Sequence, residues 1–576
     1  MGQHLGWTAL GTLFSSFDIA TSGMQAAQLQ LDVTGHNISN VNREGFSRQR
    51  VNLGTRVPIF LQQGQVGRGV AVKDIERLRD TFLDDAFRRQ NPNLGFSEVS
   101  ARFFSQIEQI FQEPGPSGTG VRINSFFDAL NDFANNVESI PARQAALSEA
   151  GALADTLNLV SRRVNDLRSN ANAEVFDAVS QINSIGDQIS RLNAQIRVLE
   201  RGGDRQASDL RDDRDLLIDQ LSRLVDITYR ERTNGEVDIQ MAGEEFVSGD
   251  FFQRLETVRD PSLDAKRPDL FRVQFVASGR TLTPANGELA AAIDMRDRVL
   301  VDVDNQMDEL AATLIQEVNR IQTQGNGLVN LTNPVRSTNL TVDGTTPLVS
   351  ADLPFDLDVP GSFDVVVYDA AGVPTVSTIN VTNTTTLDGL AAQLSGVANI
   401  NATVINDRSL EIDVDAGFSF GFANDTAGVL TALGINGLFT GSNAGDISVN
   451  ADLQARPELL TSGFSLDPLE TGDNTAALAL AALRDAPIFS DGEATINEFF
   501  EQFVTRIGVD GRTNLDRLRV DESFVDDFQR GRQEVSGVNL DEEVTNLLMF
   551  QRAFEASARV ITVTDRMLET LLNTAR

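Results

Sequence analysis

The C-terminal end of the chain carries a seven-residue repeat that constrains the fold more than any other feature. Residues spaced by seven form a first line of Leu540, Leu547, Phe554, Ile561 and Leu568. A second line, offset by four residues, consists of Val544, Gln551, Ala558, Asp565 and Leu572. Lines with this offset fill positions d and a of a heptad, which predicts a coiled-coil helix over 535–576. An amphipathic helix that caps a globular bundle is the alternative interpretation of the same pattern.

The N-terminal end is also predicted to be helical, over about residues 15–40, where the sequence contains no proline. Its apolar residues form one stripe of Ala20, Met24, Ala27, Leu31 and Ile38, and a second stripe of Ile19, Ala26, Leu29 and Val33. A helix that is apolar on two faces has to be covered on two sides. We therefore expect both chain ends to lack local partners and to be mobile in the free chain.

Between the ends, helical spacing alternates with strand patterns. This order predicts a multidomain α+β fold, in which N- and C-terminal segments form a long-helix bundle, β-rich domains are inserted, and the terminal helices form a coiled coil. The helix near the end of the bundle is predicted as two pieces, 496–507 and 515–534. The predicted segments are a disordered extension (1–11), an N-terminal axial helix with a following strand and turn (12–75), a long-helix rod domain (76–227), a small β-rich insertion (228–286), a rod helix (287–328), a β-rich outer domain (329–455), the returning helices of the rod (456–534) and a C-terminal axial helix (535–576).

Composition argues against several classes of function. The net charge is −34, and nucleic-acid binding needs clustered cations, so no nucleic acid is expected as a partner. The chain has no cysteine, and its two histidines are His4 and His36. Thiol chemistry and thiolate metal sites are thereby excluded, and histidine-based catalysis is not expected. We predict no enzyme activity, no cofactor, no metal and, because no run of 18 apolar residues occurs, no membrane span.

Two short motifs begin like binding loops but lack the residues that such loops need. The run Asp302–Asn305 starts like a calcium loop, yet positions six and twelve are Met307 and Thr313 instead of glycine and glutamate. The glycine-rich run Gly64–Gly69 lacks the Gly-Lys-Ser/Thr ending of a phosphate loop. His36 has no second histidine nearby in sequence, and we interpret it as a packing residue at a helix end.

Both ends carry signatures of a known family. The N-terminal signature is Asn37-Ile38-Ser39-Asn40-Val41-Asn42, followed by Gly45-Phe46-Ser47-Arg48. At the other end stand Ser536-Gly537-Val538-Asn539-Leu540-Asp541-Glu542-Glu543 and the run from Phe550 to Arg559. These residues resemble the terminal signatures of the flagellar rod, hook and hook-associated axial proteins. In local chemistry, Gly45 permits a reversal into a strand, and Asn539 is a good N-cap for the last helix.

Internal segments narrow this resemblance to the hook-associated proteins of the hook–filament junction. They lie at 287–297, 433–442 and 472–476, and the run from Arg211 to Leu217 fits as well. The resemblance implies an extracellular flagellar subunit that leaves the cytoplasm through the flagellar type III apparatus without a cleaved signal peptide. It implies as partners further copies of the chain in a ring at the hook tip, the hook protein, the second junction protein (hook-associated protein 3), and an export chaperone at the C-terminal region.

The predicted function is that of a structural adaptor between hook and filament, whose terminal helices fold as they assemble. The predicted assembly residues are Ile19, Leu29, Val33, Asn37, Asn40, Gly45, Leu540, Val544, Leu547, Phe554, Ala558, Ile561 and Leu568. The alternatives are another axial protein, such as a hook or distal rod subunit, a surface adhesin that uses the central β domain, and a peptidoglycan hydrolase of rod assembly.

Overall fold

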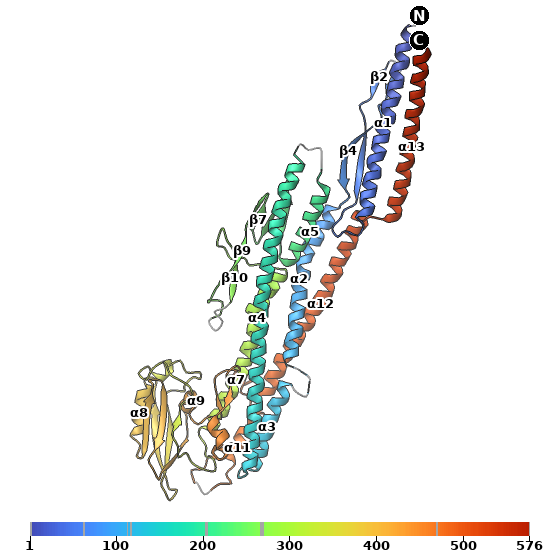
Figure 1. The fold of residues 1–576 in the computed structure, drawn as a ribbon. Coiled ribbons are helices and arrows are strands. Elements are labelled where there is room, and N and C mark those ends of the chain that lie inside the picture. Colours follow the sequence, from blue (N-terminus) through green and yellow to red (C-terminus); the bar gives the residue numbers. More distant parts are fainter. Residues whose placement is uncertain are drawn as a thin grey trace. The chain divides into compact units, whose positions relative to one another are not determined.

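The computed structural model of the chain consists of long helices with strands inserted between them (Figure 1). It describes residues 3–574 except 62–63, 112, 114, 116–117, 202–205, 265–269 and 468–469. The chain divides into two compact units. Unit 1 is made of Met1–Ala101, Ala171–Asp294 and Asn514–Arg576, and unit 2 of Arg102–Asn170 and Met295–Thr513.

Unit 1 contains the two terminal helices, which run side by side (Figure 1). An antiparallel ribbon of β1 (Gln49–Thr55) and β4 (Val70–Arg77) packs on α1, and the hairpin of β2 (Ile59–Leu61) and β3 (Gly64–Val66) extends from this ribbon. The helices that contribute to unit 1 are α1 (Gln3–Ser39), α2 (Thr81–Phe111), the second part of α4 (Ile140–Leu199), α5 (Ser208–Leu224), α6 (Glu288–Asp294), the second part of α12 (Ile496–Ser536) and α13 (Leu540–Thr574).

The main core of unit 1 lies between α4, α5 and a small sheet. The buried side chains of Ile182, Ile218, Ile239 and Phe246 belong to one apolar cluster. Every second residue from Val237 to Met241 belongs to this cluster, because one face of the sheet covers the helices. The strands are β5 (Thr228–Glu231), β6 (Val237–Met241), β7 (Glu244–Ser248) and β8 (Phe251–Phe252) in one antiparallel sheet, and β9 (Leu255–Arg259) with β10 (Phe271–Phe275) in a second.

Unit 2 is organised around α7, which buries one complete side. The helices of this unit are the last part of α2, α3 (Thr119–Asn135), the first part of α4, a π-helical turn (Met295–Val299), α7 (Leu300–Gln322), α8 (Leu387–Ser395), α9 (Val429–Leu433), α10 (Ala451–Ala455), α11 (Thr475–Ala482) and the first part of α12. Short 3₁₀ turns lie at Leu348–Ser350, Pro457–Leu459 and Ser490–Gly492.

The strands of unit 2 form small antiparallel sheets. In one, β12 (Gly361–Tyr368) lies between β13 (Pro374–Val381) and β16 (Ser419–Ala423). In another, β15 (Ser409–Val414) lies between β11 (Val335–Arg336) and β14 (Ile400–Ile405), and β17 (Phe439–Thr440) pairs with β18 (Ser448–Val449). Side chains on the inner faces, such as Val365, Ile412 and Phe420, are fully buried.

The predicted fold class is confirmed, because long terminal helices and inserted strands make a multidomain α+β protein. Two details of the prediction are wrong. The disordered extension over 1–11 is instead helical from Gln3, where α1 begins. The two predicted helices 496–507 and 515–534 are one continuous helix, α12, because the residues between them contain glycines but no proline to end it.

Candidate functional site

The terminal helices pack along each other more extensively than any other two described elements. The side chains of α13 on this face recur at steps of four and three residues and are partly or fully buried: Glu543, Leu547, Phe550, Phe554, Ser557, Ile561, Thr564 and Leu568. At Gly23 of α1, an added Cβ would stand 3.1 Å from Ser557 Oγ. A heptad face on α13 and a small residue on α1 thus allow close packing.

This packed face agrees with only one of the two predicted lines. Leu547, Phe554, Ile561 and Leu568 of the first line lie on it, whereas Leu540 at its start is exposed. The second packed line is Glu543, Phe550, Ser557 and Thr564, each of which comes one residue earlier in the sequence than its counterpart in the predicted line. In the predicted second line, Val544, Gln551 and Asp565 are exposed, Ala558 is half-buried, and the side chain of Leu572 lies outside those described.

The helix pair leaves a second apolar surface uncovered. On α13 this surface extends over more than one side of the helix and comprises side chains that are 47–54% exposed: Leu540, Val544, Leu548, Met549, Val560, Val563 and Met567. On α1, Phe14, Phe17 and the predicted residue Ile19 are exposed, whereas Leu29 is half-buried and Val33 is buried. The pair therefore satisfies one apolar face within the chain and presents another to solvent.

A buried polar joint connects the C-terminal end of α1 to the start of α13. The Asn37 side chain donates to Glu543 Oε2 (3.2 Å) and exchanges two hydrogen bonds with the backbone of Gln49 (2.9 and 3.0 Å). Arg48 donates to Glu543 Oε1 (2.8 Å) and Glu542 Oε2 (2.9 Å). Because Glu543 must meet both partners, this joint places residue 543, and not 544, on the packed face.

The turn after α1 has the geometry that its sequence predicts. Asn40 Nδ2 donates to the His36 carbonyl oxygen (2.9 Å) at the end of the helix. Gly45 has φ +77, and a Cβ there would stand 3.1 Å from Leu216 Cβ, so a side chain would be both strained and crowded. At the other end of the joint, Asn539 Oδ1 accepts from the Asp541 backbone N–H (3.0 Å), which confirms the predicted N-cap.

One acidic face of α5 holds this turn in place. Asp212 accepts from the backbone N–H and the hydroxyl of Ser47 (2.9 and 2.8 Å), and Asp213 pairs with Arg43 (2.6 Å). His36 packs its ring against Phe46 at the end of α1, with ring centroids 5.5 Å apart, as interpreted from the sequence, and its Nε2 also lies 3.2 Å from Asp209 Oδ1. Because α5 is distant from His36 in sequence, the contact with Asp209 could not be predicted from the residues around His36.

The same face of α5 continues into a dense network of ion pairs. Asp215 is surrounded by guanidinium groups from β4, from the segment after it and from α2, with pairs to Arg77 (2.8 Å), Arg79 (2.6 Å) and Arg88 (3.3 Å). Arg532 of α12 bridges Asp84 and Asp219, both at 2.7 Å. These pairs fix α2, α5 and α12 to one another directly beside the joint of the terminal helices.

The pKa values in this network follow from burial and from the arginines. Burial alone would raise the pKa of the Asp215 carboxyl, but Arg79, Arg88 and Arg77 outweigh burial and hold this pKa well below its ordinary value. Burial raises the pKa of the neighbouring Asp212 carboxyl, and its bonds with Arg77 and Ser47 offset this only in part. Asp215 is therefore a stably ionised centre of the network.

Sequence reasoning did not find this network, although α5 carries a signal for it. Asp212, Asp215 and Asp219 are spaced by three and four residues, which places them on one side of a helix. The chain holds 82 acidic residues, so the spacing of any single acidic set is uninformative without the positions of the arginines. Only the fold brings Arg77, Arg88 and Arg532 to this face.

The comparisons with known proteins agree with this architecture. "Flagellar hook-associated protein 1" of Bacillus subtilis is 26% identical over 97% of this chain and 98% of its own length. The protein of the same name from Salmonella typhimurium is 27% identical over 96% and 98%. The family model described as "Flagellar hook-associated protein FlgK helical domain" matches residues 104–335. Over nearly its whole length, the chain is therefore similar to flagellar hook-associated protein 1 of several bacteria.

Two further models match the two ends of the chain. "Flagella basal body rod protein" matches residues 17–46 and "Flagellar basal body rod FlgEFG protein C-terminal" matches residues 529–574. These ranges contain most of α1, the turn after it, and α13. A solved structure, that of the flagellar hook junction protein FlgK from Burkholderia pseudomallei, is 18% identical and covers 79% of this chain with a TM-score of 0.49.

The similarity to hook-associated protein 1 supports a structural role of the chain in the flagellum. The two shared terminal matches coincide with the helix pair and its joint, so the part held in common with rod proteins is the part described above as the candidate site. Among the described residues, no helix combines the length and the apolar character that a membrane span requires.

Proposed function

We propose that the chain is the adaptor that joins the hook to the filament, and that its terminal helices complete their folding as copies assemble. The observation that carries this proposal is the uncovered apolar surface of the helix pair. Val560, Val563 and Met567 on α13 are about half exposed, and Phe14 on α1 is more so. Apolar surface left in water on this scale is typical of a protein interface.

The energetics favour a helix pair that depends on neighbours. Each Å² of apolar surface removed from water stabilises by about 25 cal/mol. In α13, a single partner helix shields only one side, so much of this stabilisation is not realised in the isolated chain. Copies that cover the second side would supply it, and ordering of the helices would be coupled to assembly.

The proposed assembly residues divide into two groups. Leu29, Val33, Asn37, Asn40, Gly45, Leu547, Phe554, Ala558, Ile561 and Leu568 are partly or fully buried, or shape the joint, within one chain. Ile19, Leu540 and Val544 are exposed and are proposed to contact neighbouring subunits. The first group builds the helix pair, and the second group forms part of its outer surface.

We further propose the family's cellular setting for this chain. It would be exported by the flagellar type III apparatus, bound beforehand by a chaperone at its C-terminal region, and form a ring on the hook that receives the second junction protein. No catalytic role is proposed, because neither the composition nor the relatives' names suggest one. The domain limits 76–227, 228–286 and 329–455 also remain proposals.

Deletion of the gene tests the adaptor role. A junction protein predicts cells that still build hooks, carry no filaments, and release unpolymerised flagellin into the medium. Electron microscopy of the cells and immunoblotting of the medium measure both effects. Cells without hooks would indicate a rod or hook subunit instead, and normal filaments would reject the proposal.

A further inference from the structure

The hairpin that extends from the β1–β4 ribbon carries the two most exposed large apolar side chains among those described. Val57 is 82% exposed and Phe60 is 79% exposed. We name residues 56–61 and 64–69 the β-arm. Within it, Ile59 pairs with Val66, and both are also exposed. A two-stranded hairpin is marginally stable alone, and exposed apolar strands tend to pair with another surface.

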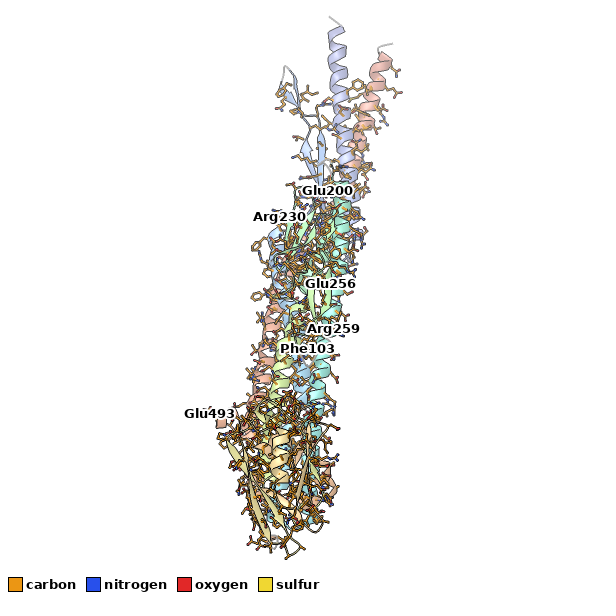
Figure 2. The ribbon with its side chains drawn as sticks, turned by 90° about the vertical axis from the view of Figure 1, so that its left-hand side faces the viewer. Phe103, Glu200, Arg230, Glu256, Arg259 and Glu493 are labelled. Carbon is orange, nitrogen blue, oxygen red and sulfur yellow. The ribbon has the colours of Figure 1, made fainter. Side chains whose placement is uncertain are left out.

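The base of the β-arm is fixed to α1, while its strands stand apart from that helix (Figure 2). Arg68 pairs with Asp18 (3.6 Å), and the Val70 backbone N–H donates to Ser22 Oγ (3.3 Å). Gly69 has φ +87, and a Cβ there would stand 2.1 Å from Ser22 Oγ, so only glycine fits this close approach. The β-arm is therefore anchored at its base and uncovered along its length.

The charge of the β-arm is opposite to that of the whole chain. Between Val51 and Lys73 the sequence contains no Asp or Glu but has Arg56, Arg68 and Lys73, whereas the net charge of the chain is −34. A cationic, apolar segment fits a partner surface that is acidic and apolar. The described structure offers such a surface at the start of α13.

This surface is the α13 stripe of Leu540, Val544 and Leu548, which follow each other at four-residue steps and are about half exposed. It lies beside the exposed carboxylates of Asp541 and Glu542. From residue 533 to residue 551 the sequence contains no Lys, Arg or His. Arg48 of the same chain pairs with Glu542 here, so the stripe combines apolar side chains with acidic neighbours, of which Asp541 is the main complement of the cationic β-arm.

Within one chain, the β-arm extends away from this stripe. The ribbon begins beside it, because Gln49 bonds to Asn37 and Asn37 to Glu543. It ends at Ser22, next to the contact of Gly23 with Ser557. Residues 544 and 557 are roughly 20 Å apart along α13, at about 1.5 Å per residue. The β-arm continues past Ser22, so only the stripe of another copy is available to it.

We propose that the β-arm of one subunit docks Val57 and Phe60 on the Leu540–Val544–Leu548 stripe of a second copy of this chain. The contact rests on the proposed function, which brings copies together in an axial assembly. It would join subunits that are displaced along the direction of their helix pairs. Arg56 and Arg68 would then lie near Asp541 and Glu542 of the neighbour.

Cysteine cross-linking tests this contact directly, because the chain has no cysteine of its own. Phe60→Cys and Val544→Cys are placed in separate chains with tags of different size, and both are expressed in a strain that lacks the gene. Any heterodimer is then intermolecular. Oxidation of isolated flagella followed by non-reducing electrophoresis should show the heterodimer as the dominant cross-linked species.

The matched control replaces Val544→Cys with Met549→Cys, since residues 544 and 549 are similarly exposed (50% and 54%) but lie on different sides of α13. Phe60→Ser gives a second readout: it should leave the melt of the free chain unchanged and reduce its incorporation into flagella. Flagella that contain both cysteine chains without the 60–544 heterodimer, or with an equally strong 60–549 heterodimer, would overturn the contact. Failure of the native chain to enter flagella would instead reject the proposed function, and the contact with it.

Discussion

Helices α7 and α13 have the same kind of amphipathic pattern, but their apolar side chains are covered to different extents within the chain. In α7, the side chains of Val303, Leu310, Leu314 and Val318 are 0–2% exposed. In α13, none of the apolar side chains that the structure describes is fully buried. A periodic apolar face therefore does not reveal whether its partners lie in the same chain. In α7 the partners are internal to unit 2, and in α13 one partner is α1 while the other side is open.

The buried polar groups of the two helices differ in the same way. Asn319 on α7 is fully buried, and its amide exchanges two hydrogen bonds with the backbone of Phe439 (2.8 and 2.9 Å). Glu543 on α13 is also buried, but its partners Asn37 and Arg48 belong to the turn at the end of α1. Asn319 fixes strand β17 in a core that is closed within the chain, whereas Glu543 sets the register of a helix pair that still exposes apolar surface.

The largest expected effect concerns the ion-pair network that supports the open pair. Asp215→Asn removes the charge that faces Arg77, Arg79 and Arg88, and breaking a buried pair in this way costs about 3–5 kcal/mol. Asp213→Asn on the same helix affects a half-exposed pair and should cost at most about 1 kcal/mol. Urea unfolding at pH 7 measures both. Equal losses would show that the network does not hold unit 1 together.

The pH dependence of the Asp215 effect has a defined sign. Because its folded pKa is lowered, its contribution is complete above the unfolded value of about 3.9 and is lost as pH falls through the folded pKa. The difference in unfolding free energy between the native chain and Asp215→Asn should be constant from pH 7 to about pH 5 and shrink below about pH 4. A difference that already shrinks between pH 7 and pH 5 would contradict the lowered pKa.

Truncation of one apolar side chain in each helix tests the comparison itself. Leu314→Ala in the closed core of unit 2 should cost about 2–5 kcal/mol. Phe554→Ala removes a half-buried ring, so in the free chain it should cost roughly half of the 3–5 kcal/mol expected for a buried one. Hydrogen exchange of amides in α7 and α13 measures the two changes separately. Equal losses, or equally protected helices in the native chain, would mean that α13 is as complete as α7.

The polar joint should contribute a smaller, separable amount. Glu543→Gln keeps the shape of the side chain but weakens its charged bond to Arg48, which should cost about 1–2 kcal/mol. Glu542→Gln removes a bond of the same arginine to an exposed carboxylate and should cost less than about 1 kcal/mol. Protection of the first turns of α13 in hydrogen exchange reports both. If Glu542→Gln lowered this protection more than Glu543→Gln, Glu543 would not be the residue that sets the register of the helix pair.

The smallest effect on stability is expected at the open surface. Val563→Ser on α13 should change the stability of the free chain by no more than about 0.5 kcal/mol, because the side chain is already half exposed. The same substitution should weaken motility and filament attachment if neighbouring copies cover this surface. Arg559→Ala, also exposed, serves as the control and should leave motility intact. Loss of stability without loss of motility at Val563 would show that this surface does not serve assembly.

Much of the fold could be predicted from local patterns. The segments around Val365 and Ile412 lie in the part of the chain predicted to be β-rich, and both form strands. Gly45 and Asn539 act as turn and cap because their backbone chemistry is local. The continuity of α12 through residues 508–514 was not predictable in this way, since neither glycine nor a polar stretch ends a helix when tertiary contacts support it.

The sequence by itself determined the helical ends, their seven-residue repeat, the family resemblance and the absence of cysteine chemistry, because these depend on residue type and spacing alone. Only the tertiary structure decided which apolar line of α13 is packed. Adjacent lines have the same period, and the choice was made by the bonds of Asn37 and Arg48 to Glu543, which bring together residues about 500 positions apart. It also decided that Asp215 is the centre of an ion-pair network, because charge pairs over long sequence separations form only where packed helices bring their faces into contact.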